Sequence, residues 1–232
     1  MSKVKDSRVR VAVHVHTLYS PCAETKIEQI GDYCRQRGVN VLGITDHDTI
    51  SGALAVKAAI GRHVRVIVGS EIKTRQGEII GLFLKKEIEP GQGALETVEQ
   101  IKEQGGLVYI PHPFDPFKIQ RLKKAALMQV LDMVDMIEVY NAKVVFPVFY
   151  SVAANFAKRH NKVGAAGSDA HYLNAIGACL NEIDDFVSPE QFLENFKNVK
   201  LLITRSGPFR AWWVGIKNVL IQEGHVVRKY GR

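Results

Sequence analysis

The sequence has little of what marks secreted, membrane-spanning or disulfide-stabilised proteins. Only three cysteines occur among 232 residues, and their spacing forms neither a CxxC pair nor a disulfide framework. The opening residues lack the apolar core of a signal peptide. No apolar run approaches the roughly 18 residues of a membrane span. Because an odd cysteine count also suits a reducing compartment, we expect a soluble, cytoplasmic protein.

The chain also lacks the features that separate domains. It contains no linker rich in proline, serine or glycine, no internal repeat and no low-complexity segment. A length of 232 residues is ordinary for a single α/β barrel, and 46% hydrophobic with 24% charged residues is typical of a globular protein. We therefore expect one domain over residues 1–232, with a motif-bearing core at about 8–205 and a C-terminal helix and basic tail at about 206–232.

Acidic residues are in deficit, since 31 lysines and arginines stand against 24 aspartates and glutamates, a net charge of +7. A basic balance suits an anionic small molecule or nucleic acid, and equally a solvated basic surface. No dense basic tract with interleaved aromatic residues is present, so nucleic acid is the less favoured partner. Nothing indicates a membrane partner, and the sequence leaves the oligomeric state open.

Short apolar segments alternate with helical patterns along the chain. Segments 39–45 and 107–110 are continuously apolar, as strands are when a parallel sheet is buried on both faces. About seven strand–helix units favour a closed barrel over an open sheet, so we expect an α/β, TIM-like barrel. Segment 78–84 is expected to pair back as a hairpin through Gln76-Gly77. Strands are expected at 8–14, 39–45, 64–68, 78–84, 107–110, 133–139, 163–166 and 201–204, and helices at 24–37, 51–60, 93–104, 119–131, 146–160 and 188–196.

Side chains able to bind a metal follow nearly every predicted strand. The carboxyl ends of barrel strands meet on one face, where active sites are built. His14 and His16 should point the same way, because side chains alternate with period two along a strand. Five of the eight histidines lie at strand ends, whereas chance would scatter them over helices and loops. The candidates are His14, His16, Asp46, His47, Asp48, Glu71, His112, Glu138, Asn141, Asp169 and His171.

Histidine and carboxylate ligands without thiolate clusters favour zinc, manganese or iron over calcium or magnesium. A catalytic zinc ion typically takes about three protein ligands, so a set this large predicts two or three divalent ions that share a carboxylate. Such ions can activate a water between them and clamp a phosphoryl oxygen. The residues therefore predict hydrolysis of a phosphate ester by a metal-bridging hydroxide.

The motifs HVHT, TDHD, the glutamate of VIVGSE, PHP and GSDAH, in this order, resemble the polymerase and histidinol phosphatase (PHP) superfamily. The resemblance spans nearly the whole chain, from His14 to about Asn181. It implies a distorted, seven-stranded (β/α)7 barrel with a di- or trinuclear metal site on its C-terminal face. Free-standing members are phosphoesterases that act on small phosphorylated metabolites or nucleotides. Other relatives are domains of bacterial DNA polymerases, or exonucleases.

The resemblance implies a role for each matching residue. Asp46 precedes His47 and is expected to orient a ligand from behind. Asp169 resembles a residue that also contacts the nucleophilic water, so Asp169 and His47 are the catalytic candidates. The implied ligands are His14, His16 and Asp169 for a first metal, Glu71 as the carboxylate that bridges it to a second, His112 for the second, and His47 and His171 for a third.

Two positions depart from the family pattern. Many small phosphoesterase relatives carry another histidine shortly after the bridging glutamate, where this chain reads GEIIGLF and offers Glu78. The position after strand 133–139 is often histidine or cysteine in relatives, where this chain offers Glu138 or Asn141. Asparagine is a weak ligand, so we expect the second metal to be held less tightly or partly by water.

Five further residues have two interpretations each. Lys143 and Arg205 follow predicted strands at the end where they could neutralise phosphate oxygens, or they are solvated surface cations. Trp212 and Trp213 would stack on a base, or they pack the final helix against the barrel. Cys22 lies where some relatives place a ligand of the third metal. As a thiolate near divalent ions it would bind zinc, and otherwise it is a small buried apolar residue.

Three functions compete. The complete ligand set favours a metal-dependent phosphomonoesterase or phosphodiesterase of the PHP type. The net positive charge motivates a nuclease that acts on oligonucleotides, whose binding would depend strongly on salt. The missing histidine and the asparagine at position 141 motivate a catalytically weak, metal-binding module.

Overall fold

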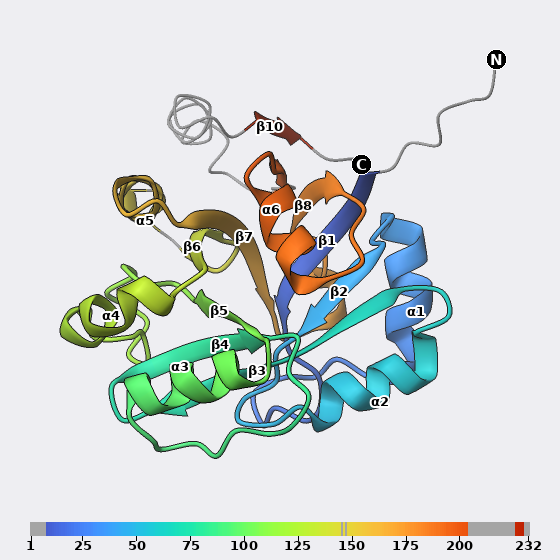
Figure 1. Ribbon diagram of the computed structural model, residues 1–232. Helices are drawn as coiled ribbons and strands as arrows, with labels where there is room; N and C mark the ends of the chain where they lie inside the picture. The colour runs from blue at the N-terminus through green and yellow to red at the C-terminus, as the bar shows by residue number, and fades with distance from the viewer. Residues whose placement is uncertain (1–7, 145, 147, 204–225, 230–232) are drawn as a thin grey trace.

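The computed structural model describes residues 8–144, 146, 148–203 and 226–229. Strands and helices alternate over most of the chain, and short strands follow the last helix (Figure 1). The main elements are β1 (Arg8–Val15), α1 (Ile27–Arg37), β2 (Val41–Ile44), α2 (Ser51–Ile60), β3 (Arg65–Thr74), β4 (Gly77–Leu82), α3 (Ala94–Glu103), β5 (Leu107–Ile110), α4 (Lys124–Val130), β6 (Met136–Asn141), α5 (Val148–Arg159), β7 (Val163–Ala170), β8 (Cys179–Asp184), α6 (Pro189–Phe196), β9 (Lys200–Ile203) and β10 (Val226–Lys229).

Seven strands close into a barrel. β1 to β7 pair in sequence order, and β1 also pairs with β7, which completes the ring. Neighbouring barrel strands are parallel except for β4, which is antiparallel to both β3 and β5. The predicted fold class, a distorted (β/α)7 TIM-like barrel, is therefore confirmed. The hairpin predicted at Gln76-Gly77 is present too, and Gly77 has φ +128°, which favours glycine.

Helices cover the outside of the barrel (Figure 1). α1 and α2 pack together, α2 also packs on β3, and α5 packs on β6. α1 ends at Gly38 in the left-handed conformation, and Ser188 accepts a hydrogen bond from Gln191 N at the start of α6. Because strands such as β5 are covered on both faces, all their residues are buried, which explains their continuously apolar sequences.

The chain after residue 160 differs from the prediction. β7 continues to Ala170 instead of ending at 166, so Asp169 lies within the strand. The sequence does not predict β8, because CLNEID mixes apolar and polar residues without a clear pattern. β8 pairs antiparallel with the first half of β1 and extends the sheet through β9 to β10.

The helix predicted at 119–131 begins only at Lys124. The residues before it are held by the β3–β4 hairpin, since Glu78 N donates to Gln120 O at 2.7 Å. The predicted C-terminal helix, with Trp212 and Trp213, lies outside the described residues, as does Arg205. Among the described residues, none of the helices is long and apolar enough to cross a membrane.

Candidate metal centre

The end of β1 brings His14 and His16 to one site through a bulge. The register of β1 against both β2 and β7 shifts before Val15, and His14 has φ +62°. The centroids of the two imidazole rings lie 5.2 Å apart. Two imidazoles do gather on one side, as expected, but they do so because of the bulge and not because of regular strand alternation.

Left-handed backbone recurs in this region. His112 has φ +31° and Asp169 has φ +47°, as well as His14 with its φ of +62°. Such conformations cost about 1–3 kcal/mol each in residues other than glycine, and they persist where surrounding contacts enforce them. At His112, for example, the backbone N–H donates to Glu138 Oε2 at 2.6 Å. The strain therefore falls on three residues that the sequence predicts as ligands.

Glu71, in β3, lies at the centre of the cluster. Its Oε2 atom is 3.3 Å from Nε2 of both His14 and His16, and 3.4 Å from Nδ1 of His47. Its Oε1 atom is 3.2 Å from His112 Nε2. Burial opposes its charge, but the neighbouring imidazoles hold the pKa of Glu71 well below its ordinary value. One ionised carboxylate is thus close to four imidazoles.

Asp169 faces the same centre from β7. Its Oδ1 atom lies 3.7 Å from Nε2 of both His14 and His16. Although burial opposes its charge, His14 and Lys118 hold the pKa of Asp169 well below its ordinary value. Within the described residues, four groups of three side chains have ligand atoms within 4.8 Å of one another: His14, Glu71 and His112; His14, His16 and Asp169; His16, His47 and His171; and His47, Glu71 and Glu78.

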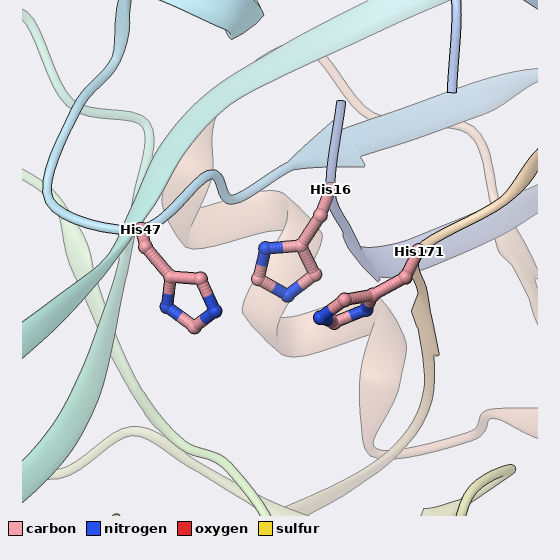
Figure 2. Close-up of side chains that lie close together, drawn as sticks. All are labelled: His16, His47 and His171. Carbon is pink, nitrogen blue, oxygen red and sulfur yellow. The ribbon is translucent and has the colours of Figure 1, made fainter. Parts of the chain in front are cut away.

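One of these groups consists of three histidines that follow three different strands (Figure 2). Figure 2 shows the ring of His16 between those of His47 and His171, and its centroid lies 4.6 Å and 4.3 Å from theirs. His16 therefore supplies the third partner for the two residues assigned to a third metal. Cys22 is exposed and belongs to none of the four groups found among the described residues, so its role as a ligand stays a prediction.

Glu78, in β4, joins the cluster at the position where the resemblance leads us to expect a histidine. Its Oε1 atom lies 3.7 Å from His47 Nδ1, and its Oε2 atom lies 3.9 Å from His112 Nε2. Burial, together with the charge of Glu71, raises the pKa of Glu78 to about 8. A cation beside this carboxylate would favour its ionised form. Glu78 thus adds a donor that the sequence indicates only as the nearest candidate.

The donor atoms of the cluster fit divalent cations. Nε2 of His14 and Nε2 of His16 are buried and find no hydrogen-bond partner in the described part of the chain, although buried polar atoms are normally paired. The carboxylate of Glu71 is buried as well, and buried negative charge needs a counter-charge. Imidazole nitrogens and carboxylate oxygens that converge in this way suit zinc, manganese or iron.

Asp46 aligns His16 from behind, through Ser20. Asp46 Oδ1 accepts a hydrogen bond from Ser20 Oγ at 2.6 Å, and Ser20 Oγ lies 3.3 Å from His16 Nδ1. Because the serine proton points to the carboxylate, Ser20 Oγ accepts the proton of His16 Nδ1. The lone pair of His16 Nε2 is then directed into the cluster. Burial lowers the pKa of His16 well below its ordinary value, which keeps this imidazole neutral.

Replacing Asp46 with asparagine is expected to lower the affinity for Mn²⁺ by about 10–100-fold. Asp46 accepts hydrogen bonds from Ser20 Oγ, Thr17 N and Thr17 Oγ1, so an amide NH₂ group would confront a donor and disturb the alignment of His16. Calorimetric titration with Mn²⁺ measures the effect, with Asp32→Asn on the exposed face of α1 as the control. Equal affinities for Asp46→Asn and wild type would show that Asp46 does not align His16.

Glu138 lies behind two of the predicted ligands. Its Oε1 atom accepts hydrogen bonds from His14 Nδ1 at 2.8 Å and Tyr109 OH at 3.0 Å. Its Oε2 atom accepts from His112 N at 2.6 Å and Asn141 Nδ2 at 2.8 Å. Four donors use the lone pairs of a carboxylate, so none is left for a metal in this arrangement. Glu138 therefore orients His14 and His112 and does not face the cluster as a ligand.

Two ammonium groups flank Asp169. Lys143 Nζ lies 3.2 Å from Asp169 Oδ1 and 2.7 Å from His171 Nδ1. Lys118 Nζ contacts Asp169 Oδ2. The oxygen of Asn141 accepts the backbone N–H of Lys143 at 2.8 Å, which holds this loop beside the cluster. The sequence predicts Lys143 here but not Lys118, because residue 118 lies in an irregular loop that has no strand end or motif beside it.

An open pocket of about 750 Å³ lies over the cluster. Its lining includes three kinds of side chain. They are the donors His47, Glu71, Glu78, His112, Asp169 and His171, the cations Lys73 and Lys118, and the large apolar or aromatic residues Tyr19, Phe117 and Ile119.

Sequence comparisons connect the chain with known proteins. The family model described as PHP-associated matches residues 151–201. An uncharacterized protein of Methanocaldococcus jannaschii is 38% identical over 146 residues, which cover 58% of this chain and 82% of that protein. A second uncharacterized protein of the same organism is 30% identical over 217 residues, which cover 88% of this chain and 87% of that protein.

Solved structures share the barrel. A two-domain protein of Bacteroides vulgatus, which contains a predicted PHP-like metal-dependent phosphoesterase, superposes with a TM-score of 0.66 at 14% identity, covering 93% of this chain and 70% of that one. PsfC of Pseudomonas syringae superposes with a TM-score of 0.66 at 17% identity, covering 93% of this chain and 98% of that one. At these identities the similarity concerns the fold.

Proposed function

We propose that this chain is a PHP-type, metal-dependent phosphoesterase that hydrolyses a phosphate ester of a small metabolite or nucleotide, and the match of residues 151–201 to the PHP-associated family model supports the proposal. The observation that carries the proposal is that four metal-binding side chains each belong to two of the four donor groups. Shared donors hold neighbouring cations close together, as in sites where two ions act on one phosphoryl group. The residues that each belong to two groups are His14, His16, His47 and Glu71.

Two or three divalent ions of zinc, manganese or iron suit the four overlapping groups, whose residues would hold them. When bound, such ions supply the positive charge that lowers the pKa of a water molecule and polarises a phosphoryl oxygen. Glu71 would hold two such ions together, because its two oxygens face different histidines: Oε1 faces His112, and Oε2 faces His14 and His16.

Asp169 and His47 are the catalytic residues of the proposal. Asp169 remains ionised, because its pKa is held well below the ordinary value, so it can accept a hydrogen bond from the attacking water and orient it. His47 lines the pocket, where its half-buried ring can reach the phosphoryl group. Lys118 and Lys143 provide ammonium groups beside Asp169 to neutralise phosphate oxygens.

The test is hydrolysis after reconstitution with Mn²⁺ or Zn²⁺. We expect turnover of p-nitrophenyl phosphate and of some member of a panel of phosphorylated metabolites and mononucleotides. His14→Ala removes a donor shared by two groups and is expected to lower kcat/KM by about 100-fold or more. His63→Ala, at an exposed histidine outside the cluster, should leave kcat/KM unchanged. If His14→Ala released phosphate at the same rate as the wild type, the result would contradict the proposal.

A further inference from the structure

The loop between β5 and α4 exposes large apolar side chains at the mouth of the pocket. Phe117 is 66% exposed and Ile119 is 92% exposed, and both line the pocket. Exposed apolar side chains scattered singly over a surface need no explanation, but several that line the same pocket mark a binding surface. The set also includes Tyr19 from the loop after β1, which is 47% exposed.

Hydrogen bonds hold this loop in place. The buried carboxylate of Asp115 accepts the backbone N–H of Phe117 at 3.0 Å. Gln120 O accepts from Glu78 N at 2.7 Å, and Lys123 N donates to Gln76 O at 2.8 Å, so the β3–β4 hairpin fixes the second half of the loop. The apolar tip is therefore presented in a defined position, which lowers the entropy cost of binding a ligand there.

A second loop supports Phe117 from behind. The ring of Phe146, after β6, stacks on Phe117 with centroids 5.5 Å apart and an interplanar angle of 28°. Phe146 in turn meets the ring of Phe149 edge to face, with centroids 6.4 Å apart. Because Phe146 braces Phe117 and does not itself line the pocket, one face of the Phe117 ring remains available to a ligand.

The side chain of the next residue, Lys118, extends toward the cluster and not toward the mouth of the pocket. Its Nζ atom contacts Asp169 Oδ2 and its side chain is 27% exposed. Consecutive residues thus present an apolar ring to the mouth of the pocket and an ammonium group to its floor. An ester bound here would have its phosphate on Lys118 and the organic group next to its phosphate on Phe117.

We propose that this pocket selects phosphate monoesters whose alcohol carries an aromatic ring or a comparable apolar group. Phe117, Ile119 and Tyr19 contact that group, and Lys118 contacts the phosphate. This selectivity rests on the proposed phosphoesterase function and names the substrate class that the site prefers. Polar esters such as sugar or glycerol phosphates have nothing to place on the apolar rim, so they bind through the phosphate alone.

Benzyl phosphate and glycerol 1-phosphate test the proposal, since both are phosphate esters of alcohols and only the first carries a ring. Phe117→Ala is expected to lower kcat/KM for benzyl phosphate about tenfold, mainly through KM, and to leave glycerol 1-phosphate unchanged. Lys118→Met should lower kcat/KM for both substrates. Val187→Ala, at a 96% exposed apolar residue that does not line the pocket, and Lys124→Met are the matched controls.

Binding measurements separate this proposal from the function on which it rests. The metal-loaded protein is expected to bind benzylphosphonate, which cannot be hydrolysed, about tenfold more tightly than methylphosphonate, and Phe117→Ala should remove the difference. Equal affinities for the two phosphonates, or equal effects of Phe117→Ala on both substrates, would overturn the apolar subsite. Tight, Phe117-dependent binding without hydrolysis of any ester would retain the subsite and refute the phosphoesterase.

Discussion

Glu71→Gln is expected to remove at least one bound divalent ion per chain and to lower kcat/KM by about 1000-fold or more. The carboxylate of Glu71 faces four imidazoles with its two oxygens. An amide keeps the size of the side chain but loses its charge and one acceptor oxygen. Two of the four donor groups contain Glu71, so both would be weakened together. Elemental analysis gives the metal content, and phosphate release gives the rate.

The matched control is Glu103→Gln, which makes the same change on an exposed position of α3. It should retain both the metal content and the activity of the wild type. Circular dichroism would show whether Glu71→Gln keeps the fold. A folded Glu71→Gln protein with full metal content and full activity would mean that this carboxylate does not bridge ions.

Gly167→Ala is expected to destabilise the protein by about 3 kcal/mol, the upper end for added volume in a packed interior. A Cβ atom at this position would lie 1.7 Å from Glu138 Oε1 and 3.0 Å from Tyr109 OH. Glu138 cannot move away freely, because its oxygens accept hydrogen bonds from His14 and His112. For a chain of this length the melting temperature should fall by about 6–12 °C.

Gly167→Ala should also reduce metal affinity, because a displaced Glu138 releases the ring of His14. Gly43→Ala, in β2, is the control: its Cβ atom would meet only ordinary contacts at 3.4 Å or more, and it removes the same glycine flexibility from the unfolded chain. Thermal unfolding of both variants with and without Mn²⁺ makes the comparison. If Gly167→Ala were as stable as Gly43→Ala, Glu138 would be able to move away from the added methyl group, and this prediction would be wrong.

The positions of the candidate ligands at strand ends could be predicted because two simple rules place them. Apolar segments mark the strands, and the barrel brings the carboxyl ends of those strands together. This reasoning finds His112 and Asp169 without knowledge of the backbone. It does not find the bulge at His14, because a left-handed residue inside a strand leaves no pattern in the sequence. His14 and His16 lie together as predicted, but the bulge brings them together and not the regular alternation of side chains along a strand.

The roles of Glu138 and Lys118 could not be predicted, because each depends on contacts between distant segments. Glu78 is different, since the hairpin predicted at Gln76-Gly77 pairs β4 with β3 and brings this residue to the cluster. Glu138 faces the back of His14, and the space for it is provided by Gly167 in another strand. Lys118 depends on the irregular loop between β5 and α4, whose second half the β3–β4 hairpin holds.

The closed barrel was easier to predict than the strands that extend its sheet. Continuously apolar strands in about seven strand–helix units favour a closed barrel, and β1 to β7 form one. β8 escaped prediction because it pairs with β1 at the edge of the barrel, where consecutive polar residues such as Asn181 and Glu182 are tolerated and no strand pattern results. Asn181 is buried and uses its amide to bond Ala166, a partner that periodicity cannot reveal.

The rate of phosphate ester hydrolysis as a function of bound metal per chain tests the central claim most directly. Chelator-treated protein would be loaded stepwise with Mn²⁺, and each sample would be divided between elemental analysis and the assay with p-nitrophenyl phosphate and benzyl phosphate. Overlapping donor groups predict that activity rises only as a second ion per chain is bound. Full activity with one ion or none, or no hydrolysis of either ester with two or three ions bound, would contradict it.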